Sequence, residues 1–542
     1  MLPSPPRLKL ALWSFSLVSL VPFLDNMLHI RAAQSSLIHS HDHPIEALIH
    51  ESRLKFEGLI KSQSANYSAA CDEYVRRYGV PPPPGFEAWF EYAKRHHSPI
   101  IDDFDTLYSG ISPFWRQTGE EFLQVMSRAY HAPNSELWLC EFSGSLAHTS
   151  CRHPYRARDR SIQFLFNTAL GDLRGALPDI KFLVNHLDEP RVMIPPDPRG
   201  SSVDIGQFNI TDFSRQSVMN MPTKPCSSQV PENRHLGQQP SALPLVADRP
   251  PALDLCRHPE YGAMHGLLMS PTTFRLIEGL VPVLSTGALS TMGDILYPSP
   301  AYIEPEFQYT EAHDVEWAHK RNTISWAGST TGGFVTNDDQ WPHFHRQRFV
   351  ALAQNLHHRH HPQYPYYYLH KTPTGAVHLH PSSFLNTRLF DVAFTTLLQC
   401  TRPYCAQQRS FFRLKPRTDK HHALRARLVF DTDGNGISGR FHRLLASKSA
   451  PLKQTLLREW HDDRLVPWVH FIPVSQAMHE LPEMVSYLML TGKGRGIAKD
   501  IADQGRVWFG KALRDVVRAV YLYRLMLEMA RLQDPERGAL VE

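Results

Sequence analysis

Short apolar runs alternate with helical stretches over the second half of the chain, and this alternation constrains the fold more than any other feature. Residues 322–333 (NTISWAGSTTGG) combine a strand with a loop of small residues, and residues 344–356 have the pattern of a helix. A strand is expected at 390–396, and residues 425–447 combine a strand, a glycine-rich bend and a helix. Strands that alternate with helices are typical of an open, mostly parallel α/β sheet. We therefore predict an α/β fold.

Further elements extend this pattern along the chain. We expect strands at 180–194, 450–456 and 467–474, and helices at 118–131, 162–174 and 514–532. The last of these is long and amphipathic, and we interpret it as a helix that closes the fold. At 542 residues the chain exceeds one hydrophobic core, so we expect two domains with extensions.

The N-terminus has the features of a targeting signal. Arg7 and Lys9 precede an apolar run at 10–24, which is shorter than the about 20 residues of a typical spanning helix. We predict an uncleaved signal-anchor, because membranes differ in thickness, with a cleaved signal peptide as the alternative. The bulk of the chain would then lie in the lumen. This interpretation makes the chain a single-pass type II protein of the Golgi or ER membrane.

Two further features agree with a secretory route. The glycosylation sequons are Asn66-Tyr67-Ser68 and Asn209-Ile210-Thr211. The seven cysteines include no CxxC pair and no metal-ligand spacing, so disulfides in an oxidising lumen are more plausible than zinc. The sequence-near pairs are Cys140 with Cys151 and Cys400 with Cys405. The connectivity stays open at this point, and the odd count leaves one thiol unpaired.

Charge excludes one class of partner. The net charge is only +4 and no dense run of Lys and Arg occurs, so no nucleic acid is expected as a partner. The 31 histidines include a concentration at 343–380, which invites a metal interpretation. Because these histidines have loop-like spacing and no complete ligand set, we interpret the stretch as a variable surface segment.

The segment LVFDTDGNGISGRFHRLL (428–445) carries the most informative motif and admits three interpretations. The first is a calcium-binding EF-hand, because its acids, asparagine and turn glycine fall at the right positions. An EF-hand loop needs a bidentate carboxylate at its twelfth position, where this chain has His442. It also needs an incoming helix, whereas the preceding residues have strand character. Calcium binding is therefore disfavoured.

The second interpretation is a metal-binding Asp-x-Asp, formed by Asp431 and Asp433. Two acids one residue apart occur by chance in most chains of this length, and the sequence offers no further ligand to complete a site. We therefore predict no metal site.

The third interpretation is a phosphate-binding loop between a strand and a helix. Glycines at 434, 436 and 439 allow a tight turn and a close approach of the backbone to a ligand. The following helix N-terminus and Arg440, which can clamp two phosphate oxygens, both suit an anion. Lys453 and Arg458 add positive charge nearby. The motif favours the diphosphate of a nucleotide.

The run from this motif to residue 474 resembles glycosyltransferase family 90, in particular its fungal capsule-associated xylosyltransferases, which are related to the Rumi protein O-glucosyltransferases of animals. Other blocks resemble the same family in the same order. They are YGVPPPPGFEAWFEYA (78–93), IIDDFDTLYSGISPFW (100–115), NHLDEPRV (185–192), DILYPSP (294–300), WAGSTTGG (326–333) and HRQRF (345–349). Together they span residues 70–530, which makes the resemblance specific.

The resemblance implies a GT-B-like architecture, in which two Rossmann-like domains face a cleft. We expect a signal-anchor or signal peptide at 1–24, a stem and N-terminal helical region at 25–115, an acceptor-side domain at 116–310 with a loop insertion at 219–253, a nucleotide-sugar-binding domain at 311–475 and C-terminal helices at 476–542. The expected activity is an inverting transfer of xylose or glucose from UDP-xylose or UDP-glucose to a hydroxyl of a glycan or glycoprotein acceptor.

An inverting transfer needs a general base that takes the proton of the acceptor hydroxyl. By resemblance to the Rumi-like "NxxD" stretch, the base is Asp188 in Asn185-His186-Leu187-Asp188. From the residues alone, Asp188 would only start a turn before Pro190.

The resemblance also implies the donor-binding residues, among them Arg440 of the "S-x-R-F" stretch and the small-residue loop around Ser329. The full expected set is Gly328, Ser329, Thr330, Arg348, Ser438, Arg440, Lys453 and Glu459. For Glu459, the role would be a contact with the ribose or donor hydroxyls, and a solvated charge is the alternative. No cofactor is required beyond the donor, and the need for a divalent cation stays open.

One residue departs from the family pattern. Rumi-like relatives carry an arginine where this chain has Ala327, and Arg346 and Arg348 are the candidates to replace it. The alternative function is accordingly a catalytically weak or inactive relative that binds a glycan or nucleotide. A third possibility from another class, a calcium-regulated secreted binding protein, is opposed by His442.

Overall fold

The computed structural model describes residues 20–21, 24–25, 27–28, 43–194, 206–226, 242–337, 339–357, 364–371, 377–417 and 419–539. The apolar run at 10–24 lies largely outside these residues, as do the middle of the predicted insertion at 219–253 and several histidines of the 343–380 stretch. Among the described residues, no helix is long and apolar enough to cross a membrane. The signal-anchor stays a prediction.

Helices pack around two sheets, and the last three elements of the described chain are helices. The α-helices are α2 (Pro44–Lys61), α3 (Tyr67–Tyr78), α4 (Phe86–Arg95), α5 (Asp105–Ile111), α6 (Gly119–His131), α7 (Ile162–Leu170), α8 (Arg249–Leu253), α9 (Gly266–Met269), α10 (His345–Ala353), α12 (Arg402–Phe411), α13 (Phe441–Leu445), α14 (Leu481–Leu490), α15 (Gly492–Ala512) and α16 (Asp515–Leu532). Short 3₁₀ helices are η1 (Ser112–Arg116), η2 (Pro259–Ala263), η3 (Pro300–Ile303), η4 (Glu311–His313), η5 (Trp317–His319), η6 (Trp341–His343), η7 (Thr387–Leu389), η8 (His422–Arg425) and η9 (Asp462–Arg464). Local sequence sets some of these ends, as at α6, where Thr118 and Glu121 form a reciprocal capping box.

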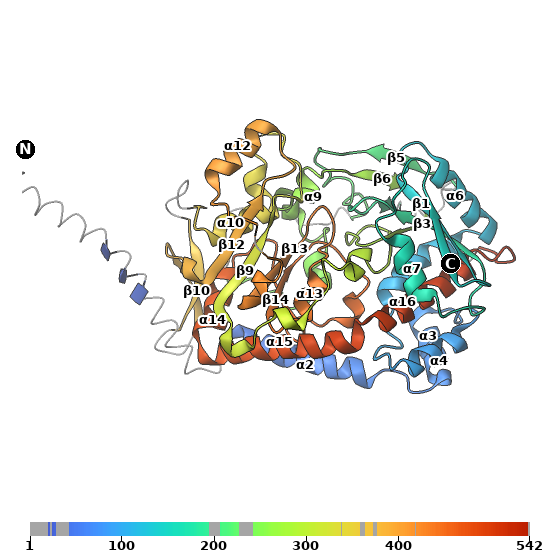
Figure 1. Cartoon of the computed structure of the whole chain (residues 1–542), viewed down its shortest axis with the longest axis horizontal. Helices are drawn as coiled ribbons and strands as arrows, with labels where there is room; N and C mark the ends of the chain where they lie inside the picture. The colour runs from blue at the N-terminus through green and yellow to red at the C-terminus, as the bar shows by residue number, and fades with distance from the viewer. Residues whose placement is uncertain are drawn as a thin grey trace, which may run out of the picture.

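The strands gather into two larger sheets that occupy opposite halves of the molecule (Figure 1). The strands are β1 (Leu137–Ser143), β2 (His148–Arg152), β3 (Ile180–Asn185), β4 (Val192–Met193), β5 (Asn209–Asp212), β6 (Arg275–Glu278), β7 (Val283–Ser285), β8 (Ile295–Leu296), β9 (Arg321–Ser329), β10 (Tyr366–Lys371), β11 (Val377–Ser382), β12 (Phe390–Thr396), β13 (Ala426–Thr432), β14 (Ala450–Gln454) and β15 (Ile472–Pro473). Within the described ranges, the first sheet has the order β2-β1-β3-β7-β8 and the second β12-β9-β13-β14-β15. A smaller sheet, β4-β6-β5, and the hairpin β10-β11 accompany them.

The second sheet is parallel throughout, as the alternating pattern predicted. Strand β9 comes first in the chain and pairs with β12 on one side and β13 on the other. The connections from β9 and from β12 therefore lead to opposite sides, which creates a topological switch point. In open α/β sheets, ligands bind outside the carboxyl ends of the strands at such a point.

The first sheet differs from a fully parallel Rossmann-like sheet, because β1 runs antiparallel to both β2 and β3. Strands β1 and β2 are joined by a short turn, which only antiparallel neighbours allow. Strands β3, β7 and β8 are parallel to one another. The predicted α/β class is confirmed, and the first half adds a hairpin to a parallel core.

The closing helix α16 connects the two halves. Helix α15 packs against β14 and α14 of the second half, and α16 then packs against α4, α7 and β3 of the first half. In Figure 1, α15 runs along the lower edge of the molecule, and α16 continues from it into the half that holds the first sheet. Side chains of α16 such as Tyr521, Leu525 and Met529 are buried in the core beneath the first sheet. The predicted helix at 514–532 is confirmed.

Helix α2, in the region predicted as a stem with helices, lies along α15. Lys493 on α15 forms an ion pair of 2.5 Å with Glu46, and Arg53 pairs with Asp500. Ile45 joins the core of the second half. This part of the N-terminal region therefore packs on the globular body.

The disulfides confirm the two sequence-near pairings and add a third. Cys140 pairs with Cys151, Cys400 with Cys405 and Cys226 with Cys256, while Cys71 is a free thiol. The strand predicted at 467–474 is shorter than expected. Residues 467–471 form a tight turn, with Trp468 at a φ of 64° and its N–H bonded to Phe471 O over 2.7 Å, so only Ile472–Pro473 pairs in the sheet.

Candidate active site

The loops that follow β9 and β13 meet at the switch point of the second sheet. Gly332 N donates a hydrogen bond of 3.2 Å to Asn435 Oδ1, so the two small-residue loops noted in the sequence contact each other. The loop after β13 also folds on itself, because Gly434 N donates to Gly436 O over 2.8 Å. The backbone of this glycine loop is thereby fixed.

Gly436 brings the glycine loop against the first half of the chain. A Cβ atom at this position would lie 2.0 Å from Asp188 O, so a larger residue would push the two segments apart. The predicted base and the predicted phosphate-binding loop, distant in sequence, are therefore neighbours in space.

Arg440 lies at the N-cap of α13 and faces the ends of the strands. Its Nη1 donates to Ala327 O over 2.8 Å, and its guanidinium carbon lies 5.5 Å from the centre of the Trp326 ring. Burial lowers the pKa of Arg440, and the carboxylate of Asp431 opposes this shift. Helix α13 has only five residues, so its dipole is small and Arg440 itself supplies most of the positive charge.

Three of the predicted donor-binding residues lie in the small-residue loop after β9, and each has a different structural role. Gly328 avoids the Trp326 ring, which a Cβ would approach to 2.8 Å. Ser329 lies 3.1 Å from the Thr331 hydroxyl and lines the cavity at the strand ends. Thr330 is buried and donates to Leu398 O over 2.7 Å, so it holds the loop in place.

The two arginines of α10 have different places. Arg346 lies beneath both loops, where its Nε donates to Asp433 O over 2.7 Å and its Nη1 to Thr331 Oγ1 over 2.6 Å. Burial, followed by the charge of Arg440, lowers the pKa of Arg346 to about 9. Arg348 instead donates to the carbonyls of Gln476 and Ala477, away from the glycine loop.

Lys453 and Glu459, both predicted to bind the donor, belong to a buried ionic network below the cavity. Lys453 Nζ lies 2.9 Å from Glu459 Oε1 and 3.4 Å from Asp431 Oδ2. Tyr302, from the first half, donates to Glu459, and Ser438 donates to Asp431 over 2.5 Å. Burial opposes the charge of Lys453, but the carboxylates of Glu459, Asp431 and Asp433 outweigh burial and raise its pKa. These side chains hold the two halves together.

The Asp-x-Asp pair is part of the same interior. Asp431 and Asp433 are each 1% exposed, and burial raises the pKa of both carboxyl groups. Asp433 accepts from Leu456 N over 2.8 Å. Within the described residues, no group of three or more His, Cys, Asp or Glu side chains is arranged to hold a metal ion.

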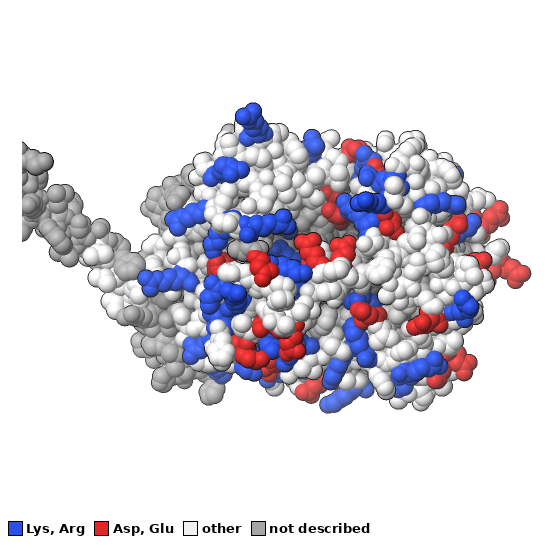
Figure 2. Space-filling view, viewed as in Figure 1, with Lys and Arg blue, Asp and Glu red and all other residues white. Residues whose placement is uncertain are grey.

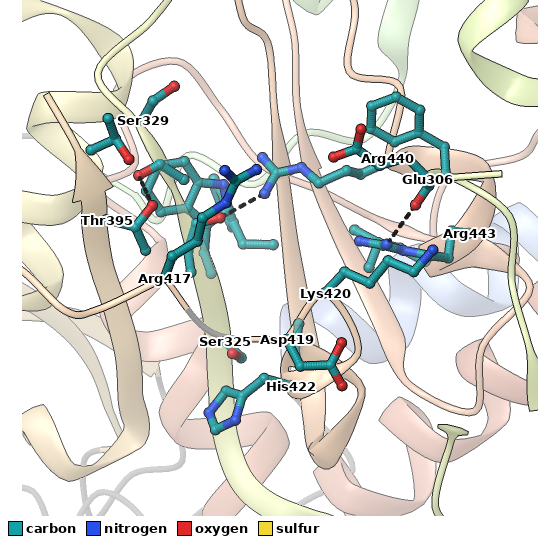
Figure 3. Close-up of a pocket in the computed structure, with 18 of the residues that line it drawn as sticks. Glu306, Ser325, Ser329, Thr395, Arg417, Asp419, Lys420, His422, Arg440 and Arg443 are labelled. Atoms are coloured by element: carbon teal, nitrogen blue, oxygen red, sulfur yellow. Dashed lines mark hydrogen bonds between the residues drawn. The ribbon is translucent and has the colours of Figure 1, made fainter. Parts of the chain in front are cut away.

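A cavity of about 600 Å³ opens over the ends of β9 and β12, and we call it the sheet-end cavity. Gly328, Ser329, Arg440 and Trp326 line it. Its other charged lining residues are Glu306, Arg417, Asp419, Lys420 and Arg443 (Figure 3). Four cations thus face two carboxylates, and the excess of positive charge suits an anionic ligand.

A second cavity of about 330 Å³, which we call the Asp188 cavity, lies between the two halves. Asp188, His186 and Glu304 line it on one side, and the glycine loop lines it on the other. Phe307 lines both this cavity and the sheet-end cavity, so the two adjoin. A ligand in one cavity can therefore reach a group in the other.

Local contacts hold the Asp188 side chain at the end of β3. Asn185 Oδ1 accepts from Leu187 N over 2.9 Å, and Asn185 Nδ2 donates to Glu189 O over 2.8 Å. Arg160 Nη1 donates to Asp188 Oδ1 over 2.7 Å. The Asp188 side chain remains about half exposed, as a group that exchanges protons with a substrate requires.

The neighbours of Asp188 are buried and differ from it in chemistry. His186 Nδ1 accepts from Trp138 Nε1 over 2.9 Å, and burial lowers its pKa to about 4, so the ring is neutral. Burial raises the pKa of Glu189 to about 7, although Thr273 donates to both of its oxygens. Asp188 is thus the accessible carboxylate of this turn.

Charged side chains surround the middle of the face shown in Figure 2. Both signs occur there, and Lys, Arg and acidic side chains lie on both halves of the molecule. This mixed pattern agrees with the small net charge of +4.

Comparison with known proteins fits this geometry. The family model described as glycosyl transferase family 90 matches residues 379–537. Over this region the chain is similar to glycosyltransferase family 90. The region includes β12 to β15, the glycine loop and the three C-terminal helices, and the similarity implies glycosyl transfer with a sugar donor and an acceptor. A search of curated proteins gave no match.

The candidate site contains residues that the sequence analysis did not select. Arg417, Lys420 and Arg443 line the sheet-end cavity, and Arg160 orients Asp188. Arg443 lies three residues beyond Arg440 on α13, a spacing that places both on one side of a helix and could have indicated it. Arg417 and Lys420 lie in a polar stretch without periodicity, so no sequence signal marks them.

Proposed function

We propose that the protein is an inverting glycosyltransferase that moves xylose or glucose from a UDP-sugar to a hydroxyl of a glycan or glycoprotein acceptor. The observation that carries this proposal is the contact of Gly436 with Asp188. It brings a partly exposed carboxylate next to a glycine loop whose following arginine faces a cationic cavity. A base beside an anion site is what transfer from a nucleotide sugar requires.

The donor would occupy the sheet-end cavity. Its volume of about 600 Å³ lies within the about 300–1,000 Å³ of small-molecule sites. The diphosphate would lie against Arg440 and Ser329, because guanidinium groups and hydroxyls are the donors that phosphate oxygens accept. The transferred sugar would lie near Phe307, at the border with the Asp188 cavity.

The acceptor hydroxyl would enter the Asp188 cavity. Its oxygen attacks the anomeric carbon while the Asp188 carboxylate takes its proton, and the bond from that carbon to the phosphate oxygen breaks. The electron pair leaves with UDP, whose new charge Arg440 stabilises. Attack from the face opposite UDP inverts the anomeric centre. Arg160 keeps the Asp188 carboxylate aimed into the cavity.

This assignment gives the two halves the roles of a GT-B enzyme. The half with the first sheet would receive the acceptor, and the half with the second sheet would hold the donor. Support comes from the position of the Asp188 cavity between them and from the switch point in the second sheet. The first sheet, with its antiparallel β1, would be a variant of the usual Rossmann-like domain.

We place the enzyme in the Golgi or ER lumen, attached by the N-terminal segment. Three disulfides support an oxidising compartment, because such bonds persist in the secretory pathway and are rare in the cytosol. The chemistry above uses no cofactor apart from the UDP-sugar.

The test is an activity assay of the purified full chain with UDP-xylose and UDP-glucose, with and without EDTA. We expect UDP release that depends on a glycan acceptor, and a product of inverted configuration by NMR. Asp188→Asn should abolish transfer and preserve UDP binding. If the chain binds UDP but Asp188→Asn has the same low activity as the wild type, the inactive relative, favoured by Ala327, is correct.

A further inference from the structure

The cations of the sheet-end cavity differ in how they are held. Lys420 Nζ donates to Pro305 O over 3.0 Å, and Arg443 Nη1 donates to Glu306 O over 3.2 Å. Arg440 donates to Ala327 O. Arg417 also lines the cavity, yet among the described residues its side chain has no hydrogen-bond or ion-pair partner. Its charge is therefore available to a ligand.

The backbone on both sides of Arg417 is anchored. Lys415 N donates to Phe394 O, at the end of β12, over 3.0 Å. Beyond Arg417, His421 N donates to Asp419 Oδ1 over 3.2 Å, and the Lys420 side chain reaches Pro305 O. The chain is thus tied to Phe394 before Arg417 and to Pro305 after it, and such ordering lowers the entropy cost of using this residue in binding.

Arg417 and Arg440 reach into the cavity from opposite sides, and their guanidinium groups point toward one another (Figure 3). Arg440 already lies close enough to Arg346 to lower the pKa of Arg346, after the larger effect of burial. Within the described part of the chain, neither Arg417 nor Arg440 forms an ion pair with a carboxylate. An anion between the two guanidinium groups would therefore give both of them a partner of opposite charge.

We infer that Arg417 and Arg440 form a two-guanidinium clamp on the diphosphate of the nucleotide sugar. This inference rests on the proposed function and adds to it a residue from outside the glycine loop. Each guanidinium presents a planar fork of N–H donors that matches two phosphate oxygens, so two of them suit two linked phosphate groups. Arg417 also stabilises the charge that develops on UDP as the sugar leaves.

The test is calorimetric titration of the full chain with UDP, with inorganic pyrophosphate and with uridine. The variants are Arg417→Ala, Arg417→Lys and Arg440→Ala, with Arg413→Ala as the matched control. Arg413 is an exposed arginine of the same segment that does not line the cavity. A charge-assisted hydrogen bond contributes enough for its loss to weaken binding about 10- to 100-fold.

We expect Arg417→Ala to weaken UDP and pyrophosphate binding about 10- to 100-fold and to leave uridine binding unchanged. Arg417→Lys should recover only part of the affinity, because an ammonium lacks the bidentate fork. Arg413→Ala should bind as the wild type. UDP binding that Arg440→Ala weakens and Arg417→Ala does not would overturn the clamp and leave the proposed function standing. A wild-type chain that binds neither UDP nor pyrophosphate would overturn both.

Discussion

Two groups of charged side chains lie around the same strand ends, and they differ in almost every physical respect. Arg440 and Arg417 face the sheet-end cavity without a carboxylate partner in the described chain. Lys453 and Glu459 lie below it, 2% and 0% exposed, and pair with each other over 2.9 Å. The first group is available to a ligand, and the second is satisfied by the protein.

The difference arises from strand register. Strands β13 and β14 are parallel, and Lys453 is the register partner of Asp431. Their side chains therefore lie on the same face of the sheet, inside the protein. Arg440 comes eight residues after β13 ends, beyond the glycine loop and at the start of α13. A charged side chain near the glycine loop is thus available to a ligand when it lies beyond the strand end, as Arg440 does. It pairs with other protein side chains when it lies within the strand, as Lys453 does.

The largest effect is expected for Asp188, which lines the Asp188 cavity, and it concerns the rate of transfer. Asp188→Asn should lower kcat about 10²- to 10⁴-fold, the usual contribution of a general base. The side chain is partly exposed, so the melting temperature should stay close to that of the wild type. Initial rates and UDP titrations check this. A kcat within a few-fold of the wild type would remove Asp188 from the mechanism.

Substitutions in the buried ionic network of Lys453, Glu459 and Asp431 should instead lower the stability of the protein. Lys453→Met leaves Glu459 and Asp431 without their cation, which should cost about 3–5 kcal/mol of unfolding free energy. The matched control, Lys420→Met at the exposed mouth of the cavity, should change stability by less than about 0.5 kcal/mol. Urea denaturation measures both. Equal stability of the two variants would show that the buried network is not an internal tie.

The third prediction concerns the buried His470 and the pH dependence of the unfolding free energy. Burial lowers the pKa of His470 to about 3, while an unfolded histidine titrates near 6.5. Above that pH the ring is neutral in both states. As the pH falls below about 6.5, only the unfolded state takes up the proton, so this group removes about 1.4 kcal/mol of stability per pH unit.

His470→Gln should therefore make the loss of stability between pH 6.5 and 4 shallower by about 1.4 kcal/mol per unit. Urea denaturation of both proteins at several pH values gives the two slopes. Parallel slopes would mean that His470 takes up its proton in the folded state as well.

The smallest effect is expected at the rim of the cavity. Lys420 is exposed and already donates to Pro305 O. Lys420→Ala should weaken UDP binding by no more than about 1 kcal/mol, and the difference should shrink as salt is added. Titrations at two ionic strengths test this. A large loss of UDP affinity that does not depend on salt would show that Lys420 contacts the ligand directly.

Much of the fold was predictable because its signals are local. The strand at 390–396 and the closing helix at 514–532 carry clear patterns, and the structure places β12 and α16 there. The antiparallel β1 was not predictable, because strand direction depends on pairing between distant segments. The Cys226–Cys256 bond likewise spans 30 residues and leaves no local signal.

The candidate site divides in the same way. The glycine loop and Arg440 follow from residues that are adjacent in sequence, and Asp188 follows from a resemblance. The burial of Lys453 follows from the register of β13 and β14, which the sequence does not specify. Arg348 and Arg346 are two residues apart on α10, yet helical rotation sends only Arg346 to the glycine loop.

The account's central claim is that Arg440 and the glycine loop hold the diphosphate of a nucleotide sugar. The most direct test is calorimetric titration of UDP into the wild type and Arg440→Ala, with Arg413→Ala as the control. We predict that the wild type and Arg413→Ala bind UDP equally, and that Arg440→Ala binds about 10- to 100-fold more weakly with an unchanged melting temperature. Equal UDP affinity of Arg440→Ala and the wild type would contradict the account.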